Sequence, residues 1–358
     1  MKTNDEKIYY LSYLRVIACV AIIWLHTFTM EVMFYKNDLS TFNDIASNTV
    51  PFIMMWAVPC FVMVTGALLL EPKKELGFKK ILGRYLVRMV IALVGFMELI
   101  QVYDHAVYNK DFTGQHLIDG LKNAVFTITE KGTVWSHTWY LYLMISIYLM
   151  LPVYRMVTRS AKKEELRYLT LVYFLFNSLL WAGQVLSGRT TGFYLMVYTI
   201  YPLFLFMGYC LHTGVIKLGR AAGCVLFLLG EGLLGWLTYV RLHTADEQFS
   251  ANLASVLDSY AAPMIVMAAV GAYALFKSFD SEKEIPVLDK AAAELDKCSF
   301  GIYLLHIMVY KHIFGYMHFD PFAHGGFGML ALVMLAALAV SYGVTRLLKF
   351  VPFVKNII

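Results

Sequence analysis

Charged side chains are scarce in this chain of 358 residues. Asp, Glu, Lys and Arg together make up 15% of the sequence, whereas a soluble domain carries roughly 25%. This shortage excludes an ordinary soluble protein, and 59% hydrophobic residues with a mean hydropathy of +0.61 indicate a polytopic membrane protein. We therefore predict an all-α fold built from membrane-spanning helices, because helices satisfy their own backbone hydrogen bonds in lipid.

Cysteine is also scarce, and its pattern excludes two kinds of site. The five cysteines lie in or beside apolar segments and show no paired ligand spacing, so neither a disulfide framework nor a zinc site is expected. The first apolar segment lacks a small-residue cleavage site, so we expect no signal peptide. No connection is long enough for an appended soluble domain, and residues 1–358 are expected to form a single integral-membrane domain.

Apolar runs predict about ten spans. They cover Ile8–Met30, Asn48–Leu70, Ile81–Val102, Thr138–Met156, Leu166–Val185, Gly192–Leu211, Ala221–Arg241, Leu253–Phe276, Cys298–Tyr316 and Gly326–Leu348. Lys and Arg concentrate in the even-numbered connections and after the last span. The second connection holds Lys73, Lys74, Lys79, Lys80 and Arg84, and the fourth holds Arg155, Arg159, Lys162, Lys163 and Arg167. The positive-inside rule then predicts that both termini are cytoplasmic. The net charge of +5 is dispersed over these connections, which excludes a nucleic-acid-binding face.

Arg15 and His26 are the most informative polar pair, because both lie inside the first span. Intramembrane ionisable groups are costly and need a partner, a ligand or water. The eleven positions between them correspond to about 16 Å of helix and about 20° of rotation, so both project from one face at different depths. This spacing predicts a polar path through the membrane.

Other polar residues fall at matching depths. His137 and His306 are expected in the outer half with His26, and Arg84 and Arg88 in the inner half with Arg15. Such sets could move protons and hold anions, respectively. Ordinary roles remain open for each: snorkelling or helix pairing for Arg15, core hydrogen bonds for His26 and His306, an interfacial belt for His137, and membrane anchoring for Arg84 and Arg88.

Two further sets of residues carry weaker signals. Glu98 and Glu231 are intramembrane acids that fit either a proton relay or, more simply, pairing with Lys, Arg or Tyr. His312, His318 and His324 have regular spacing but no accompanying carboxylate or cysteine framework, so no metal site is expected.

Five motifs, in order, resemble the integral-membrane acyltransferases of the acyltransferase-3 type. They are Arg15 followed by His26, the stretch VPCFVMVTGALLL from Val58, the basic segment FKKILGRYLVR, HTWYL from His137, and SFGIYLLH ending at His306. The likeness spans nearly the whole chain. The second motif is similar to the branch that includes enterobacterial-antigen-type acetyltransferases and the membrane part of vancomycin-type serine racemases.

The resemblance implies an O-acyltransferase that decorates a surface glycan with an acyl group, acetyl by default, taken from cytoplasmic acyl-coenzyme A. In that scheme Arg15, Arg84 and Arg88 bind the donor phosphates, and His26 and His306 are catalytic. His26 deprotonates the acceptor hydroxyl or, alternatively, carries the acyl group covalently.

The acceptor side and the cellular setting follow from the same resemblance. His137, Trp139 and Tyr140 suit a sugar platform at the outer mouth. The expected partners are acyl-coenzyme A, a cell-surface glycan or lipid-linked sugar, and the lipid bilayer of the bacterial cytoplasmic membrane. No permanently bound cofactor is expected, and a homo-oligomer is left open. A transporter or exporter of a glycan or amino acid is the alternative, because it would use similar spans and intramembrane ionisable groups.

Overall fold

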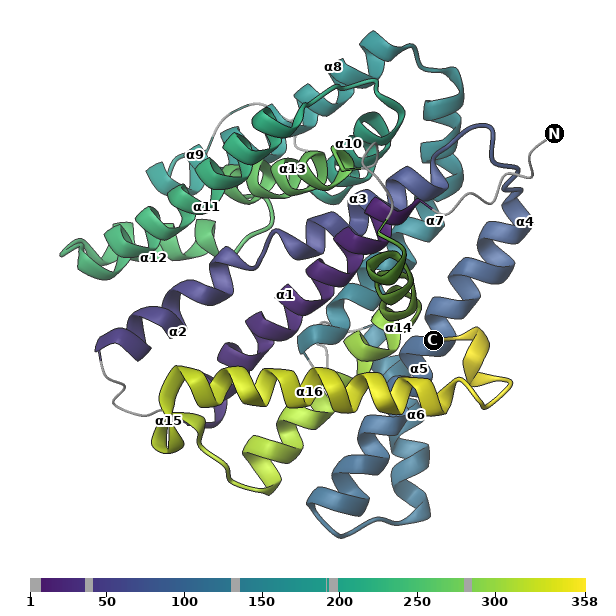
Figure 1. The fold of residues 1–358 in the computed structure, drawn as a ribbon, viewed down its shortest axis with the longest axis vertical. Helices are drawn as coiled ribbons and strands as arrows, with labels where there is room; N and C mark the ends of the chain where they lie inside the picture. The colour runs from purple at the N-terminus through teal and green to yellow at the C-terminus, as the bar shows by residue number, and fades with distance from the viewer. Residues whose placement is uncertain (1–7, 36–40, 130–135, 191, 193–198, 280–284) are drawn as a thin grey trace. The chain divides into compact units, whose positions relative to one another are not determined.

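The fold is helical throughout the part of the chain that the structure describes. This computed structural model describes residues 8–35, 41–129, 136–190, 192, 199–279 and 285–358, and these ranges contain no strand (Figure 1). The all-α prediction is therefore confirmed.

Seven helical segments in the described ranges are long and apolar enough to cross a membrane. They are α1 (Tyr9–Phe34), α2 (Thr41–Ile53) with α3 (Ala57–Leu69), the segment Phe78–Tyr108, α7 (Trp139–Ser160), the segment Lys163–Ser187, α11 (Arg220–His243) and α16 (Gly326–Leu348). Each overlaps one of the expected spans. Their length and composition identify a membrane protein.

Three expected spans take another form. The helix α10 (Tyr201–Thr213) has 13 residues, and much of the chain expected before it lies outside the described residues. The span expected over Leu253–Phe276 is divided into α12 (Glu247–Leu257) and α13 (Pro263–Lys277), because a proline disfavours helical geometry in the residue before it. The helix α14 (Pro286–Tyr310) begins well before Cys298. The count of ten spans and the cytoplasmic termini stay predictions.

Two of the long segments, and the end of α14, contain π-helical turns. These are η1 (Ile81–Leu86) between α4 (Phe78–Lys80) and α5 (Val87–Tyr103), η2 (Asp104–Tyr108) after α5, η4 (Leu175–Leu180) between α8 (Lys163–Phe174) and α9 (Trp181–Ser187), and η5 (Lys311–Tyr316) after α14. Such turns occur in α-helices mostly as short bulges, often at functional sites. The remaining elements are α6 (Gly114–Thr129), η3 (Ser136–Thr138), α15 (Pro321–His324) and η6 (Val354–Asn356).

The helices form two compact units. The first comprises residues 1–71, 160–299 and 321–334, and the second comprises residues 72–159, 300–320 and 335–358. Both α14 and α16 contribute residues to each unit. The expectation of a single integral-membrane domain stays a prediction.

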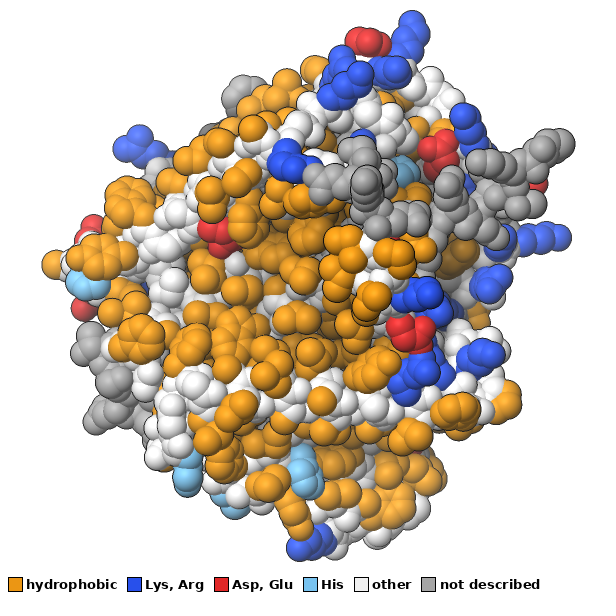
Figure 2. All heavy atoms as spheres, in the orientation of Figure 1, with side chains coloured by type: hydrophobic (Ala, Val, Ile, Leu, Met, Phe, Trp, Pro, Cys, Tyr) orange, Lys and Arg blue, Asp and Glu red, His pale blue; other side chains and the backbone are white. Residues whose placement is uncertain are grey.

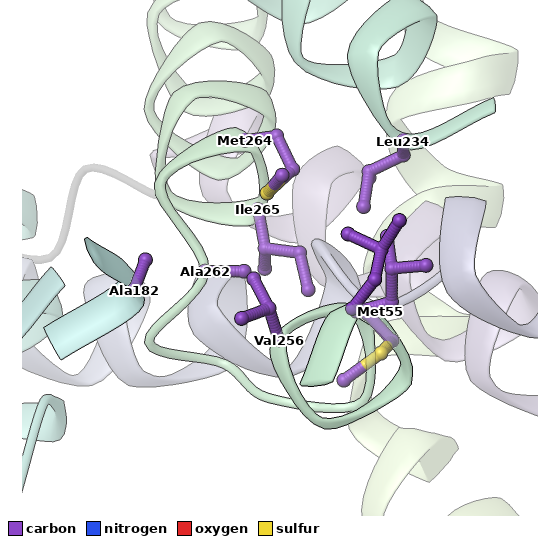
Figure 3. Packing of buried hydrophobic residues seen from close by; sticks show 9 residues of the cluster. Met55, Ala182, Leu234, Val256, Ala262, Met264 and Ile265 are labelled. Carbon is purple, nitrogen blue, oxygen red and sulfur yellow. The ribbon is translucent and has the colours of Figure 1, made fainter. Parts of the chain in front are cut away.

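Close helix packing holds the first unit together. A Cβ atom at Gly66 of α3 would lie 1.9 Å from the Leu205 carbonyl oxygen of α10, and one at Gly208 would lie 2.0 Å from the Met63 oxygen. Only glycine permits this approach of two backbones, as in other tightly packed membrane helices. A second buried cluster joins α11, α12 and α13 through residues including Leu234, Val256 and Ile265 (Figure 3).

The surface is also apolar. Hydrophobic side chains dominate the face shown in Figure 2, including the surface of α16. Exposed large side chains on α11 and α16 include Leu228, Trp236, Leu332 and Leu347. Such a broad exposed apolar surface would aggregate in water and is suited to lipid.

Candidate active site

Arg15 is paired with an acid that the sequence analysis did not single out. Its Nη2 atom donates to Asp296 Oδ2 of α14 at 2.8 Å, and Ser12 Oγ donates to the same oxygen at 2.8 Å. Ser12 lies three positions before Arg15, so both project from one face of α1. The apolar helix thus accommodates its cation through a carboxylate and a hydroxyl.

Part of the Arg15 guanidinium remains available. Its Nε atom is buried and has no hydrogen-bond partner among the described residues. The Arg15 side chain is 32% exposed, whereas that of Asp296 is 8% exposed. A guanidinium has five N–H donors, so an anion could share Arg15 with Asp296 or displace the carboxylate.

The two other predicted donor-binding residues lie in the second unit and differ in exposure. Arg84 lies in the π-helical turn η1 and is exposed, together with Lys79 and Lys80. Arg88 is half-buried in α5, where its Nε donates to the Ile357 carbonyl oxygen at 2.8 Å and its guanidinium lies 5.6 Å from the Phe300 ring centroid. The free surface of Arg84 makes it the more accessible of the two for an anion.

His137 and His306 lie together in the second unit, with ring centroids 5.7 Å apart. Both side chains are almost fully buried. His306 Nδ1 lies 3.2 Å from the Ile302 carbonyl oxygen one turn earlier. Because a carbonyl oxygen only accepts, this contact requires a proton on Nδ1 and leaves the Nε2 lone pair of neutral His306 for another partner.

Tyr303 links the two histidines and was missed in the sequence. Its hydroxyl donates to the His137 carbonyl oxygen, and its ring centroid lies 5.7 Å from that of His137 and 6.0 Å from that of His306. Tyr303 precedes His306 by three positions, a helical spacing that could have identified it.

The remaining predicted residues lie around this group or in the other unit. The Tyr140 ring packs 5.5 Å from Tyr303, and the Trp139 ring lies 6.2 Å from Tyr140. Both are partly exposed, as an acceptor platform requires. His26 is half-buried on α1 in the first unit. Its place beside His306 therefore stays a prediction.

Arg155 has an environment that its position in the sequence did not suggest. It was expected among the cations of the fourth connection, but α7 continues to Ser160 and only 2% of Arg155 is exposed. Its Nη2 donates to the Lys74 carbonyl oxygen at 2.6 Å. Because a buried guanidinium must satisfy several donors, Arg155 fixes the segment before α4 against α7.

Glu98 and Glu231 form no salt bridge with Lys or Arg among the described residues. One carboxylate oxygen each of Glu98 and Glu231 is buried without a hydrogen-bond partner in the described part of the chain. Glu98 Oε2 faces Gly120 of α6, where a Cβ would lie 2.3 Å away. Pairing of these two acids with Lys or Arg is therefore not seen in the described chain, and the proton relay stays a prediction.

One described group has the residue types for a metal. Ligand atoms of His105, Asp111 and His116 lie within 4.8 Å of one another. The two imidazole rings are stacked with centroids 3.7 Å apart and planes at 8°. A metal lies in the plane of each imidazole ligand, and two stacked planes share no such point unless the rings turn. In this geometry the group instead closes the turn between α5 and α6.

Comparison with known families gives one match. The family model described as an acyltransferase domain, of the acyltransferase-3 type, matches residues 8–346. No curated protein and no solved structure gives a significant match.

Proposed function

Because this chain belongs to the acyltransferase-3 family, we propose that it transfers an acetyl group from cytoplasmic acetyl-coenzyme A to a hydroxyl of an extracytoplasmic glycan or lipid-linked sugar. Its general activity as a membrane acyltransferase follows from the family. The donor, the acceptor, the acetyl group and the bacterial cytoplasmic membrane are parts of the proposal. The stretch from Val58 favours the branch that includes enterobacterial-antigen-type acetyltransferases and the membrane part of vancomycin-type serine racemases.

The observation that carries the catalytic proposal is the buried contact between His137 and His306. Two imidazoles inside an apolar helical unit are costly to retain without a function. The hydrogen bond to Ile302 orients His306 and makes Nε2 the acceptor atom of the neutral ring. His306 is therefore suited to accept a hydrogen bond from the acceptor hydroxyl and orient it.

His26 is the proposed general base. Its imidazole takes the proton of the acceptor hydroxyl while the hydroxyl oxygen attacks the thioester carbonyl carbon. The carbon–sulfur bond then breaks, and the coenzyme A thiolate takes the proton back from His26. An acyl-histidine intermediate is the second route, in which His26 attacks the thioester first.

The arginines supply the donor site in this proposal. Exposed Arg84 and neighbouring Lys79 and Lys80 provide positive charge for the coenzyme A phosphates. Arg15, whose side chain is 32% exposed, supplies a further donor for these phosphates. Acetyl-coenzyme A would thus be held at its charged end while the thioester reaches the histidines.

The test is acetyl transfer by purified protein in nanodiscs, with radiolabelled acetyl-coenzyme A and either lipid-linked sugar or water as acceptor. An acyltransferase should release coenzyme A and should lose this activity with His26→Ala. A transporter should release none above the protein-free rate, and that result would overturn the proposal.

Sidedness needs a separate experiment. Single cysteines introduced at Lys74 and Lys162 should react with an impermeant reagent only from the cytoplasm, because both lie in Lys- and Arg-rich connections. Labelling of intact cells from outside would reverse the topology and remove cytoplasmic acetyl-coenzyme A as the donor.

A further inference from the structure

A cavity of about 440 Å³ opens in the first unit. Four helices line it: α1, α2, α11 and α12. Its polar lining residues are Thr29, Ser47, Asn48, Arg241, Ser255 and Asp258. The volume falls within the range of small-molecule sites.

Local hydrogen bonds hold α12 against the end of α11. Asp246 caps α12 by accepting from the Phe249 N–H at 2.9 Å. Ser250 Oγ donates to the Arg241 carbonyl oxygen at 3.1 Å. These contacts place the Ser255 side of α12 opposite Arg241, so the polar lining comes from fixed elements.

The hydrophobic cluster of Figure 3 supports the same elements. Leu253, Val256 and Leu257 of α12 are buried in it, next to the cavity-lining Ser255 and Asp258. Phe52 of α2 packs against the cluster and also lines the cavity. The cavity therefore has a rigid apolar support, as pre-organised binding sites do.

Two buried polar atoms in the lining lack a partner. Ser47 is 8% exposed, and its Oγ has no hydrogen-bond partner among the described residues. Arg241 donates from Nη2 to Asn48 Oδ1 at 3.1 Å and lies over the Phe52 ring at 5.6 Å, but its buried Nε has no partner in the described chain. Buried polar groups are nearly always satisfied, so these atoms point to a polar occupant.

The lining chemistry specifies the occupant. The Arg241 guanidinium only donates, an ionised Asp258 only accepts, and the hydroxyls of Ser47 and Ser255 do both. Opposite charges in one cavity disfavour a ligand with a large net charge of either sign. The hydroxyls of a sugar ring donate and accept, and its C–H faces suit Phe52 and Pro51.

We propose that this cavity binds a neutral sugar unit of the acceptor glycan. The acceptor role rests on the proposed function. Thr29, a lining residue, lies three positions after His26, which is about 4.5 Å along the helix, and its Oγ1 donates to the His26 carbonyl oxygen at 3.3 Å. A sugar in the cavity would thus lie beside the helical turn that carries the proposed base.

Cysteine protection tests the site without any turnover. Ser255→Cys adds an exposed thiol to the lining, and Gln248→Cys adds one to the exposed part of the same helix outside it. Each variant, in nanodiscs, is alkylated with a charged maleimide in the presence of methyl glucoside, N-acetylglucosamine or free serine. The parent protein corrects for its own cysteines, of which only Cys224 is not buried. Thr29→Cys is the second lining variant if Ser255→Cys does not fold.

The expected result is sugar-dependent protection. At about ten times the half-protecting sugar concentration, alkylation of Ser255→Cys should slow about tenfold, by mass action, and that of Gln248→Cys should not change. Adding Arg241→Gln to Ser255→Cys should raise the half-protecting concentration about tenfold or more. Protection by serine but not by sugars would identify a zwitterion site and overturn the proposal, as would equal alkylation with and without sugar in both lining variants.

The outcome is separable from that of the transfer assay, because alkylation needs no acetyl-coenzyme A. Sugar protection in a protein without donor turnover would refute the acyl transfer and retain the sugar site. Donor turnover without sugar protection would refute the sugar site and retain the acyl transfer.

Discussion

Asp296 Oδ2 receives hydrogen bonds from Arg15 Nη2 and Ser12 Oγ, each 2.8 Å long, and joins α14 to α1 within the first unit. The arginine expected to bind the donor is thus also part of the internal structure. Substitution of its partner Asp296 should therefore change stability, whereas substitution of Arg15 by lysine should change donor affinity.

Asp296→Asn should lower stability because it leaves a partly buried guanidinium without its counter-charge. Loss of one partner of a buried pair costs 3–5 kcal/mol, and the partial exposure of Arg15 reduces this to about 1–3 kcal/mol. Thermal unfolding in detergent measures the loss. Asn retains a hydrogen-bonding oxygen, so Asp296→Ala should cost more, and equal melting of the parent and both variants would contradict the pair.

Arg15→Lys should weaken acetyl-coenzyme A binding by about tenfold or more. Lysine keeps the positive charge but loses the planar donor set, including the buried Nε. Calorimetric titration measures donor affinity. Arg220→Lys is the matched control, since Arg220 is exposed on α11 and stacks on Phe279. An Arg15→Lys variant that binds acetyl-coenzyme A with the parental affinity would exclude a bidentate hydrogen bond from the guanidinium to the donor.

His306→Asn should impair transfer while preserving the fold, because the Asn amide can still donate to the Ile302 carbonyl. Loss of a general base or its orienting group typically lowers the rate about 10²–10⁴-fold, and His26→Ala should lose at least as much. Donor affinity should hold in both variants, and exposed His324→Asn serves as the control. Transfer at the parental rate in His306→Asn would assign His306 to packing alone.

Arg155→Ala should destabilise the protein by about 2–4 kcal/mol, because it removes a charged hydrogen bond to the Lys74 carbonyl oxygen and the packing of a buried side chain. Arg159→Ala, on the same helix and exposed, should change the melting temperature little. Similar melting of the two variants would show that Arg155 is solvated.

Acidification should loosen the turn between α5 and α6. The hydrogen bond from His105 holds the pKa of Asp111 below its usual value. A depressed pKa means that Asp111 stabilises the turn above about pH 4 and that this contribution is lost as pH falls through the folded-state pKa. Hydrogen-exchange protection of the Asn109 and Asp111 amides reports the change, and Asp111→Asn should remove its pH dependence.

The sequence predicted what depends on composition and local spacing. Scarce charge and long apolar runs were sufficient for the helical membrane fold. His137 and His306, which were expected at one depth, have ring centroids 5.7 Å apart. Helix periodicity acts over a few residues, so side chains within one span could be placed on a common face.

Contacts between residues far apart in the sequence could not be predicted from composition and local spacing. Asp296 lies 281 positions from Arg15, and it was assigned to a connection because apolar character begins only at Cys298. The burial of Arg155 follows from the position of the Lys74 carbonyl, which hydropathy does not encode. Likewise, the cavity around Arg241 requires four helices whose mutual packing no local pattern specifies.

The π-helical turn η1 has a consequence for how the length of this chain can vary. Its i to i+5 hydrogen bonds hold one residue more per turn than an α-helix, between basic Lys79 and half-buried Arg88. Deleting a single residue within Ile81–Leu86 could restore an ordinary turn without breaking the helix. Because the wider turn already accommodates the extra residue, the same deletion would leave Lys79 and Lys80 on nearly the same face relative to Arg88. Homologous chains that are one residue shorter here would therefore keep both the helix and the direction of its basic end.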